Sequence, residues 1–262
     1  MPYLKTGGAN IFYEQKGQGP PLLLIAGMSR DASSWQYILK ELTDKFELIM
    51  FDNRGCGRST FGDAFSLSDI AGDALALLDH LGHNKAHVCG HSMGGMVAQE
   101  MALNHPEKID KLILASTSPK LSLHALGILD DLLVKWENNY DAAEWFRELY
   151  QWLFSPSALG NKKFIDAAII FALSYPYAQT LDGFRTQVRA ITQFDLSSNL
   201  KGITNNTLLI SGTEDILIPP EESKQLLDIR GKTTFSTIVG AAHSLHAEKP
   251  GEFAALVNQF LR

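Results

Sequence analysis

Apolar residues follow two alternating patterns along the first half of the chain. Short runs rich in leucine and β-branched residues are separated by segments in which apolar residues recur at helical spacing. This alternation is typical of a mostly parallel sheet that is covered by helices on both faces. The predicted strands are Leu22–Ala26, Glu47–Asp52, Ala86–Gly90 and Lys111–Ser116, and the predicted helices are Trp35–Leu42, Ser66–Leu81 and Met93–Asn104.

The two ends of the chain extend this pattern. The segments Tyr3–Thr6 and Ile11–Lys16 flank a Gly-Gly turn and predict an opening hairpin. The alternation resumes after residue 200, where the predicted elements are strand Thr207–Ser211, helix Glu221–Asp228, strand Thr233–Val239 and terminal helix Gly251–Leu261. The chain is therefore predicted to form one α/β scaffold from residues 1–118 and 201–262.

The stretch from residue 119 to 200 differs in character. Its segments are helical and dense in large aromatic side chains. It lies between two strands of the scaffold, so we interpret it as a helical lid inserted into the α/β core. Four of its aromatic residues are candidates to line an apolar substrate pocket: Trp136, Trp145, Trp152 and Tyr175.

Composition excludes several classes of protein. The chain has 262 residues, of which 45% are hydrophobic and 20% charged, and its formal net charge is −6. These values exclude an intrinsically disordered chain, and the absence of basic runs predicts that neither nucleic acid nor an anionic membrane is a partner. The two cysteines are too few for a disulfide framework, and the N-terminus lacks the pattern of a signal peptide. We therefore expect a cytoplasmic protein.

The strongest chemical signal is the sequence Gly90-His91-Ser92-Met93-Gly94-Gly95. It places a G-x-S-x-G motif between a predicted strand and a predicted helix. A serine at such a sharp turn needs glycine two positions before and after it, so that strand and helix can pass closely. The turn also directs the Met93 N–H and the helix N-terminus toward a site where negative charge can develop. Ser92 is thus a candidate nucleophile.

A serine nucleophile needs a base, which a carboxylate orients. Asp215 follows a predicted buried strand, and Glu214 beside it is the competing acid. His243 lies between the last predicted strand and the terminal helix, and His246 is the competing base. We favour Asp215 and His243 because a long side chain at 214 is expected to point to solvent and residue 246 falls near the start of a helix.

These residues resemble the α/β-hydrolase fold superfamily, in which serine, acid and histidine follow each other in this order. The resemblance implies an eight-stranded, mostly parallel sheet with an antiparallel second strand, and a lid after the sixth strand. It implies that Ser92 is the nucleophile, that His243 is the general base and then acid, and that Asp215 orients His243. It also implies that the backbone N–H groups of Met28 and Met93 form the oxyanion hole, although Ala26 stands where relatives have a histidine.

The turn Asp52-Asn53-Arg54-Gly55-Cys56-Gly57-Arg58-Ser59 and the GHSMGG elbow are most similar to the 3-oxoadipate enol-lactonase and carboxylesterase-like branch. The resemblance implies hydrolysis of a small to medium, partly apolar ester or lactone through an acyl-enzyme, with a small-molecule substrate as the partner. Carbon–carbon bond hydrolysis, cofactor-free perhydrolysis and slow-turnover ligand sensing remain alternatives. No cofactor or metal site is expected, since no P-loop or dinucleotide-binding motif occurs and no third ligand accompanies His87 and His91.

Overall fold

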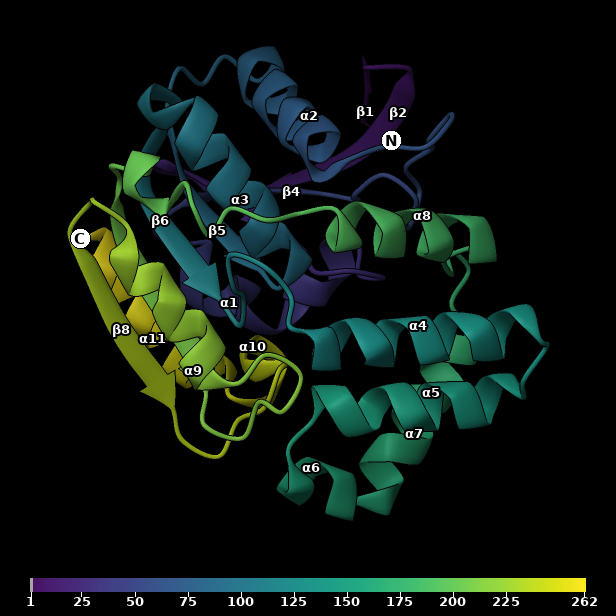
Figure 1. Ribbon diagram of the computed structural model, residues 1–262. Helices are drawn as coiled ribbons and strands as arrows, with labels where there is room; N and C mark the ends of the chain where they lie inside the picture. Colours follow the sequence, from purple (N-terminus) through teal and green to yellow (C-terminus); the bar gives the residue numbers. More distant parts are fainter. Residues whose placement is uncertain (1) are drawn as a thin grey trace.

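The computed structural model describes residues 2–262, which form an eight-stranded sheet with the strand order β1-β2-β4-β3-β5-β6-β7-β8 (Figure 1). The strands β3 to β8 run parallel to one another, and β2 is antiparallel to both of its neighbours. The expected antiparallel second strand is therefore confirmed. The strands are β1 (Tyr3–Thr6), β2 (Ala9–Lys16), β3 (Pro21–Ile25), β4 (Glu47–Phe51), β5 (Ala86–His91), β6 (Ile109–Ala115), β7 (Asn206–Gly212) and β8 (Thr233–Ile238).

Each face of the sheet carries its own hydrophobic core. Strand side chains alternate between the faces, so Leu23 and Ile25 of β3 belong to one core while Leu22 and Leu24 belong to the other. Helices α2 (Leu67–His80) and α3 (Met93–Asn104) cover the first face. The 3₁₀ helix η1 (Ala32–Ile38), α1 (Leu39–Leu42) and α11 (Pro250–Leu261) cover the second. Burial of both faces explains why the central strands are almost continuously apolar.

Two predicted helices differ from the structure in their type. The segment 35–42 divides equally between the end of the 3₁₀ helix η1 and the short helix α1. The Asp31 side chain caps η1 by accepting from the Ser33 N–H, so the helical turn begins at residue 32. The segment 221–228 divides into α9 (Pro220–Ser223) and the 3₁₀ helix η4 (Lys224–Asp228). The prediction for 66–81 is close to α2, which Ser66 and Asp69 begin with a capping box.

Five α-helices lie between β6 and β7, in the stretch predicted to be a lid. They are α4 (Leu123–Glu137), α5 (Ala142–Leu153), α6 (Pro156–Gly160), α7 (Lys162–Ser174) and α8 (Leu181–Thr192). Figure 1 shows α4 to α7 as a layered group beside the sheet, with α8 leading back toward the scaffold. At Gly183 the backbone of α8 approaches Gly55 so closely that a Cβ atom at residue 183 would lie 2.2 Å from the Gly55 carbonyl oxygen.

The aromatic side chains of these helices pack mainly on one another. Trp136 and Trp145 have ring centroids 5.0 Å apart, and both rings contact Phe184 of α8. The indole N–H of Trp145 donates to the Leu132 carbonyl oxygen, so its burial leaves no unpaired donor. No helix formed by residues 2–262 combines the length and the apolar character needed to cross a bilayer.

Candidate active site

Ser92 occupies a strained turn between β5 and α3. Its backbone has φ 55° and ψ −120°, a conformation that residues other than glycine rarely adopt. A Cβ atom at residue 90 would lie 2.2 Å from the Gly94 carbonyl oxygen, and one at residue 94 would lie 2.1 Å from the Ile25 carbonyl oxygen. The two glycines of the G-x-S-x-G motif are thus required by the close passage of β5, α3 and β3.

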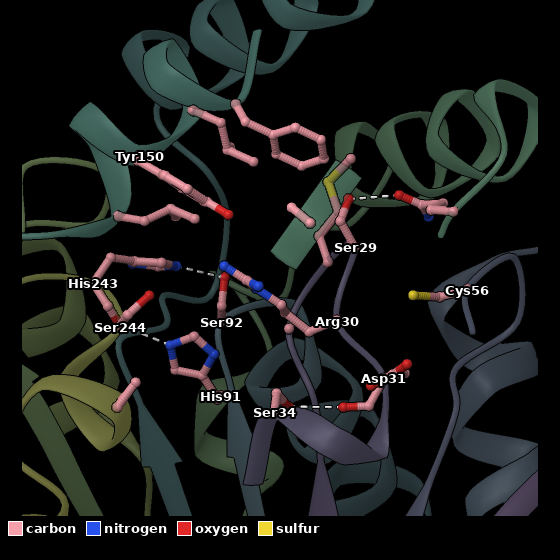
Figure 2. Close-up of a pocket in the computed structure, with 18 of the residues that line it drawn as sticks. Ser29, Arg30, Asp31, Ser34, Cys56, His91, Ser92, Tyr150, His243 and Ser244 are labelled. Carbon is pink, nitrogen blue, oxygen red and sulfur yellow. Dashed lines mark hydrogen bonds between the residues drawn. The ribbon is translucent and has the colours of Figure 1, made fainter. Parts of the chain in front are cut away.

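Ser92, His243 and Asp215 form a continuous hydrogen-bonded chain. The Ser92 Oγ lies 2.9 Å from His243 Nε2, and His243 Nδ1 lies 2.9 Å from Asp215 Oδ2 (Figure 2 shows the first contact). The other carboxylate oxygen of Asp215 accepts hydrogen bonds from the backbone N–H groups of Leu217, at 3.0 Å, and Ile218, at 2.9 Å. These bonds hold the carboxylate in place, so that it can fix the Nδ1–H tautomer of His243.

The competing acid and base lie elsewhere. Glu214 is exposed, whereas Asp215 is buried beside the histidine. His246 lies in the short helix α10 (Leu245–Glu248), where its ring packs against Trp35 with centroids 4.8 Å apart. Burial, followed by the positive charge of Arg30, lowers the pKa of His246 to about 3. The structure therefore brings Asp215 and His243, and neither competitor, to Ser92.

His91, the residue before Ser92, supports the loop that carries His243. Its Nε2 donates to the His243 backbone carbonyl oxygen at 2.8 Å, which fixes the Nε2–H tautomer because a carbonyl only accepts. Burial, and then the nearby His246 and His243, hold the pKa of His91 well below its usual range. His91 is therefore neutral and acts as a fixed donor beneath the site.

Met28 and Met93 line the cavity, and their backbone N–H groups donate to none of the described residues. Met93 is the first residue of α3, so its N–H has no acceptor within the helix. Among residues 2–262, no backbone or side-chain oxygen accepts a hydrogen bond from the Met28 N–H. Both residues line the same cavity as Ser92. This arrangement can supply two hydrogen-bond donors to a developing oxyanion.

Amide side chains support the loop that carries Met28. The Gln187 Oε1 accepts from the Ser29 N–H at 3.0 Å, and the Gln179 Oε1 accepts from the Ser29 Oγ at 2.6 Å. The Asn53 Nδ2 donates to the Ala26 carbonyl oxygen at 2.8 Å. These residues were missed from the sequence, because Gln179 and Gln187 are about 150 residues from the loop they hold and belong to no local motif.

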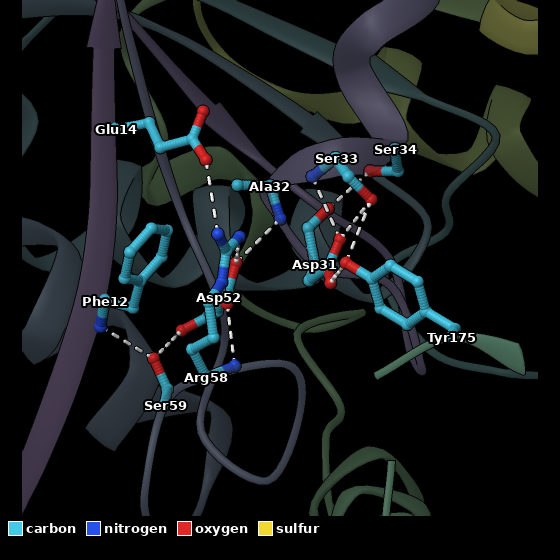
Figure 3. A network of polar contacts seen from close by, with 10 residues as sticks. All are labelled: Phe12, Glu14, Asp31, Ala32, Ser33, Ser34, Asp52, Arg58, Ser59 and Tyr175. Atoms are coloured by element: carbon cyan, nitrogen blue, oxygen red, sulfur yellow. Dashed lines mark hydrogen bonds and ion pairs between the residues drawn. The ribbon is translucent and has the colours of Figure 1, made fainter. Parts of the chain in front are cut away.

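The turn of residues 52–59 is held by two ion pairs whose carboxylates are buried. Arg54 forms two hydrogen bonds with Asp73 of α2, one of them at 2.7 Å. Asp52 accepts from Arg58 Nε at 2.9 Å and from the Ala32 N–H at 2.9 Å, while Ser59 links this turn to β2 (Figure 3). Burial is the main influence that raises the pKa of Asp52, and the bonds to Arg58 oppose it. The turn is therefore a structural support beneath the cavity.

Cys56 of the same turn lies at the cavity wall but is buried. Burial is the main reason why its thiol pKa lies far above its ordinary value, and the carboxylates of Asp31 and Asp52 act in the same direction. A neutral thiol is a weak nucleophile. Cys56 therefore contributes packing to this wall.

Tyr175 ties the inserted helices to the scaffold. Its hydroxyl group donates to Asp31 Oδ2 at 2.5 Å (Figure 3), and Asp31 Oδ1 caps η1 through Ser33. Burial, and then the bond to Asp31, raise the pKa of Tyr175 to about 12, so the phenol remains a donor at neutral pH. This bond joins a loop after α7 to the loop that carries Met28.

A cavity of about 570 Å³ opens between Ser92 and the inserted helices. Three of the predicted substrate-binding residues, Trp136, Trp145 and Tyr175, lie along its wall. The structure does not place Trp152 there, because its ring packs edge-on against His124 with centroids 5.8 Å apart. Trp145 and Trp152 share the apolar side of α5, and apolar spacing does not reveal which residues of that side face the cavity and which pack on a neighbouring helix. Within residues 2–262, no three His, Cys, Asp or Glu side chains gather as a metal site.

Comparison with known proteins identifies the family. The sequence profile described as "alpha/beta hydrolase fold" matches residues 20–250, most of the chain. The chain belongs to the α/β-hydrolase fold family. The resemblance found in the sequence is thereby confirmed, as is the fold that it implied. The α/β-hydrolase fold supports hydrolysis as the general activity of this chain.

Relatives cover nearly the whole of this α/β hydrolase. A protein of Caulobacter sp. (strain K31) named "Putative carbamate hydrolase RutD" is 26% identical over 267 aligned positions, which cover 98% of each chain. A thermophilic esterase from Thermogutta terrifontis is 26% identical with a TM-score of 0.85, covering 99% of this chain and 96% of its own. The enol-lactonase from Burkholderia xenovorans LB400 has a TM-score of 0.89 at 23% identity, covers 99% of each chain, and shares the fold.

Proposed function

We propose that this α/β hydrolase is a serine hydrolase that cleaves a small to medium, partly apolar ester or lactone through an acyl-enzyme. The observation that carries the proposal is the chain of 2.9 Å contacts from Ser92 through His243 to Asp215. Two unused backbone donors beside Ser92, at Met28 and Met93, support it further. The aromatic and aliphatic wall of the cavity favours a substrate with a hydrocarbon part.

The proposed reaction begins when Ser92 Oγ attacks the carbonyl carbon and His243 Nε2 takes its proton. The carbonyl oxygen gains negative charge, which the Met28 and Met93 N–H groups stabilise. His243 then donates the proton to the departing oxygen as the carbon–oxygen bond breaks. A water molecule, activated by His243, hydrolyses the acyl-enzyme and regenerates Ser92. Asp215 orients the imidazole and stabilises its charged form throughout.

Labelling with a fluorophosphonate tests the nucleophile directly. We expect one labelled residue, Ser92, by peptide mass spectrometry, and turnover of short p-nitrophenyl esters by the same preparation. Ser92→Ala is the matched variant and should lose both signals while keeping its circular dichroism spectrum. A folded protein in which Ser92 is not labelled contradicts the proposal. Labelling with no turnover across the ester panel instead favours slow ligand sensing.

A carbamate is the second candidate substrate class, because the relative with 98% coverage carries that name. Its carbonyl group undergoes the same serine attack, and the leaving group differs. An aryl N-alkylcarbamate added to the ester panel distinguishes the two. If the carbamate is turned over faster than the matched ester, carbamates are the substrate class. If Ser92 is stably carbamoylated without turnover, esters are the substrate class.

A further inference from the structure

The cavity contains one cationic and one anionic side chain. Among the cavity residues in the described part of the chain, Arg30 is the one Lys or Arg and Asp31 is the one Asp or Glu. The rest of the wall is formed mainly by aliphatic, aromatic and small side chains, together with the histidines of the site. The electrostatic environment of a bound molecule therefore depends on whether Arg30 and Asp31 are paired with other groups of the protein.

Both carboxylate oxygens of Asp31 already accept hydrogen bonds from other residues of the protein. Its Oδ1 accepts from the Ser33 N–H at 2.9 Å and from the Ser33 hydroxyl group, and its Oδ2 accepts from the Tyr175 hydroxyl group at 2.5 Å. Asp31 is also buried. Its role is to cap η1 and to hold Tyr175, so it is not a free anionic site in the cavity.

The guanidinium of Arg30 has no partner within residues 2–262. The arginines of the neighbouring turn are both paired, Arg54 with Asp73 and Arg58 with Asp52. By contrast, the Arg30 side chain forms no ion pair and donates no hydrogen bond to any of the described residues. Arg30 is partly buried and lines the cavity, so its five N–H donors and its positive charge are held there without a partner from the described residues.

Arg30 is placed to act on the substrate of Ser92. It lies two positions after Met28 on the same loop, and Figure 2 shows its side chain pointing into the pocket on the side of Ser92. Its positive charge is the largest influence after burial on the lowered pKa of His246, which lines the same cavity. A planar guanidinium with free donors matches the geometry of a carboxylate, which it binds through two parallel hydrogen bonds.

We propose that Arg30 binds a carboxylate of the substrate, so that this hydrolase prefers esters or lactones carrying a carboxylate in addition to the bond that is cleaved. The inference rests on the proposed function and deepens it by naming a substrate class. In this proposal the hydrocarbon between carboxylate and ester lies against the apolar wall, and the carboxylate pairs with the Arg30 guanidinium.

Matched pairs of simple esters test this preference. Monoethyl succinate, glutarate and adipate are compared with ethyl butanoate, pentanoate and hexanoate, so that each pair differs by a terminal carboxylate in place of a methyl group. Acid release is followed by pH-stat titration, which needs no chromophore. We expect kcat/KM to favour the carboxylate at one chain length by about 10-fold or more, as for a hydrogen bond between charged groups.

Three variants assign the preference to Arg30. Arg30→Met should lower the carboxylate-to-neutral ratio of kcat/KM about 10- to 100-fold, and Arg30→Lys should retain part of it because the charge remains. Arg189→Met is the matched control, since Arg189 is exposed on α8, and it should keep the wild-type ratio. Circular dichroism melting curves show whether each variant is folded.

Two results overturn the proposal. One is a wild-type ratio near unity at every chain length. The other is an Arg30→Met variant that keeps the wild-type ratio of kcat/KM between the carboxylate ester and the neutral ester. This includes a variant that loses activity equally on both esters, because an equal loss means that Arg30 stabilises the oxyanion or the fold.

A binding measurement separates this proposal from the proposed function. Monoethyl glutarate is titrated into Ser92→Ala by calorimetry, and the same titration is made with Ser92→Ala combined with Arg30→Met. Binding by the first protein and weaker binding by the second, about 10-fold or more, supports the carboxylate site even if no ester is hydrolysed. Equal binding by both proteins contradicts the site even if Ser92 proves to be the nucleophile.

Discussion

Gln187→Leu should damage both stability and catalysis, because Gln187 holds the Met28 loop from a distance. Its side chain is fully buried on α8 and makes three hydrogen bonds. It accepts from the Ser29 N–H at 3.0 Å and from the Gln179 Nε2 at 2.9 Å, and it donates to the Arg54 carbonyl oxygen at 2.9 Å. Leucine has a similar volume but no polar atom, so the substitution removes the bonds and fills the space.

The magnitude follows from the groups that lose their partners. The Ser29 N–H and the Arg54 carbonyl oxygen each become unpaired at a cost of about 1–3 kcal/mol, so the free energy of unfolding should fall by about 2–6 kcal/mol. Ser29 is adjacent to the proposed oxyanion donor Met28, and one such donor contributes about 10²–10³-fold to kcat. A displaced rather than deleted donor should therefore lower kcat by about 10- to 100-fold.

The assay combines urea unfolding with steady-state kinetics on a short p-nitrophenyl ester. Gln187→Glu provides the decisive comparison, because a carboxylate keeps an acceptor for the Ser29 N–H and loses the donor to Arg54. It should lose stability and retain more kcat than Gln187→Leu. Gln193→Leu is the control, since Gln193 is an exposed glutamine at the end of α8 and should change neither quantity.

Two outcomes would refute this reasoning. If Gln187→Leu keeps the wild-type kcat, the Met28 loop holds its position without α8. If Gln187→Leu and Gln187→Glu lose kcat equally, the loss reflects general damage to the fold and not the Ser29 hydrogen bond.

Three further predictions concern single residues. Asp215→Asn should keep the fold and lower kcat about 10⁴-fold, as in other triads, and an unchanged rate would assign the acid to Glu214. Gly94→Ala should prevent folding, measured as loss of soluble yield, because its Cβ would lie 2.1 Å from a carbonyl oxygen of β3. Gly127→Ala is the control: it has open space around it and should stabilise α4 by about 0.5–1 kcal/mol. The pKa of His246 is about 3 in the folded protein, below its unfolded value of 6.5, so its contribution to stability is present above pH 6.5 and is lost as the pH falls toward 3. The free energy of unfolding, measured with urea between pH 6.5 and 4, should therefore fall by up to about 1.4 kcal/mol per pH unit more in wild type than in His246→Phe. Equal slopes would contradict the buried neutral histidine.

Local patterns predicted the scaffold well because the central strands β3 to β7 are largely buried on both faces. The continuous apolar run of β3 and the helical spacing of α2 are properties of short segments. In each segment the apolar positions indicate which residues are buried. The 3₁₀ form of η1 was not predictable from apolar spacing. Its N-cap is Asp31, whose carboxylate accepts from both Ser33 and Tyr175, a residue 144 positions away.

The candidate site shows the same division. Ser92, Asp215 and His243 were found because each follows a strand, and the carboxyl ends of parallel strands meet at one edge of a sheet. The choice of Asp215 over Glu214 used only the expected direction of a side chain, and the structure shows that Asp215 contacts His243. Gln187 could not be found in this way, because its partner Ser29 is far away in the sequence.

The sequence by itself determined the order of elements, the strained turn at Ser92 and the order of its candidate partners, because these depend on glycine, on strand-length apolar runs and on spacing along the chain. The tertiary structure decided which side chains face the cavity, how Gln179 and Gln187 hold the Met28 loop, and that Arg30 is left without a partner. Those properties depend on packing between segments distant in sequence, and a guanidinium is paired or free only by what the fold brings beside it.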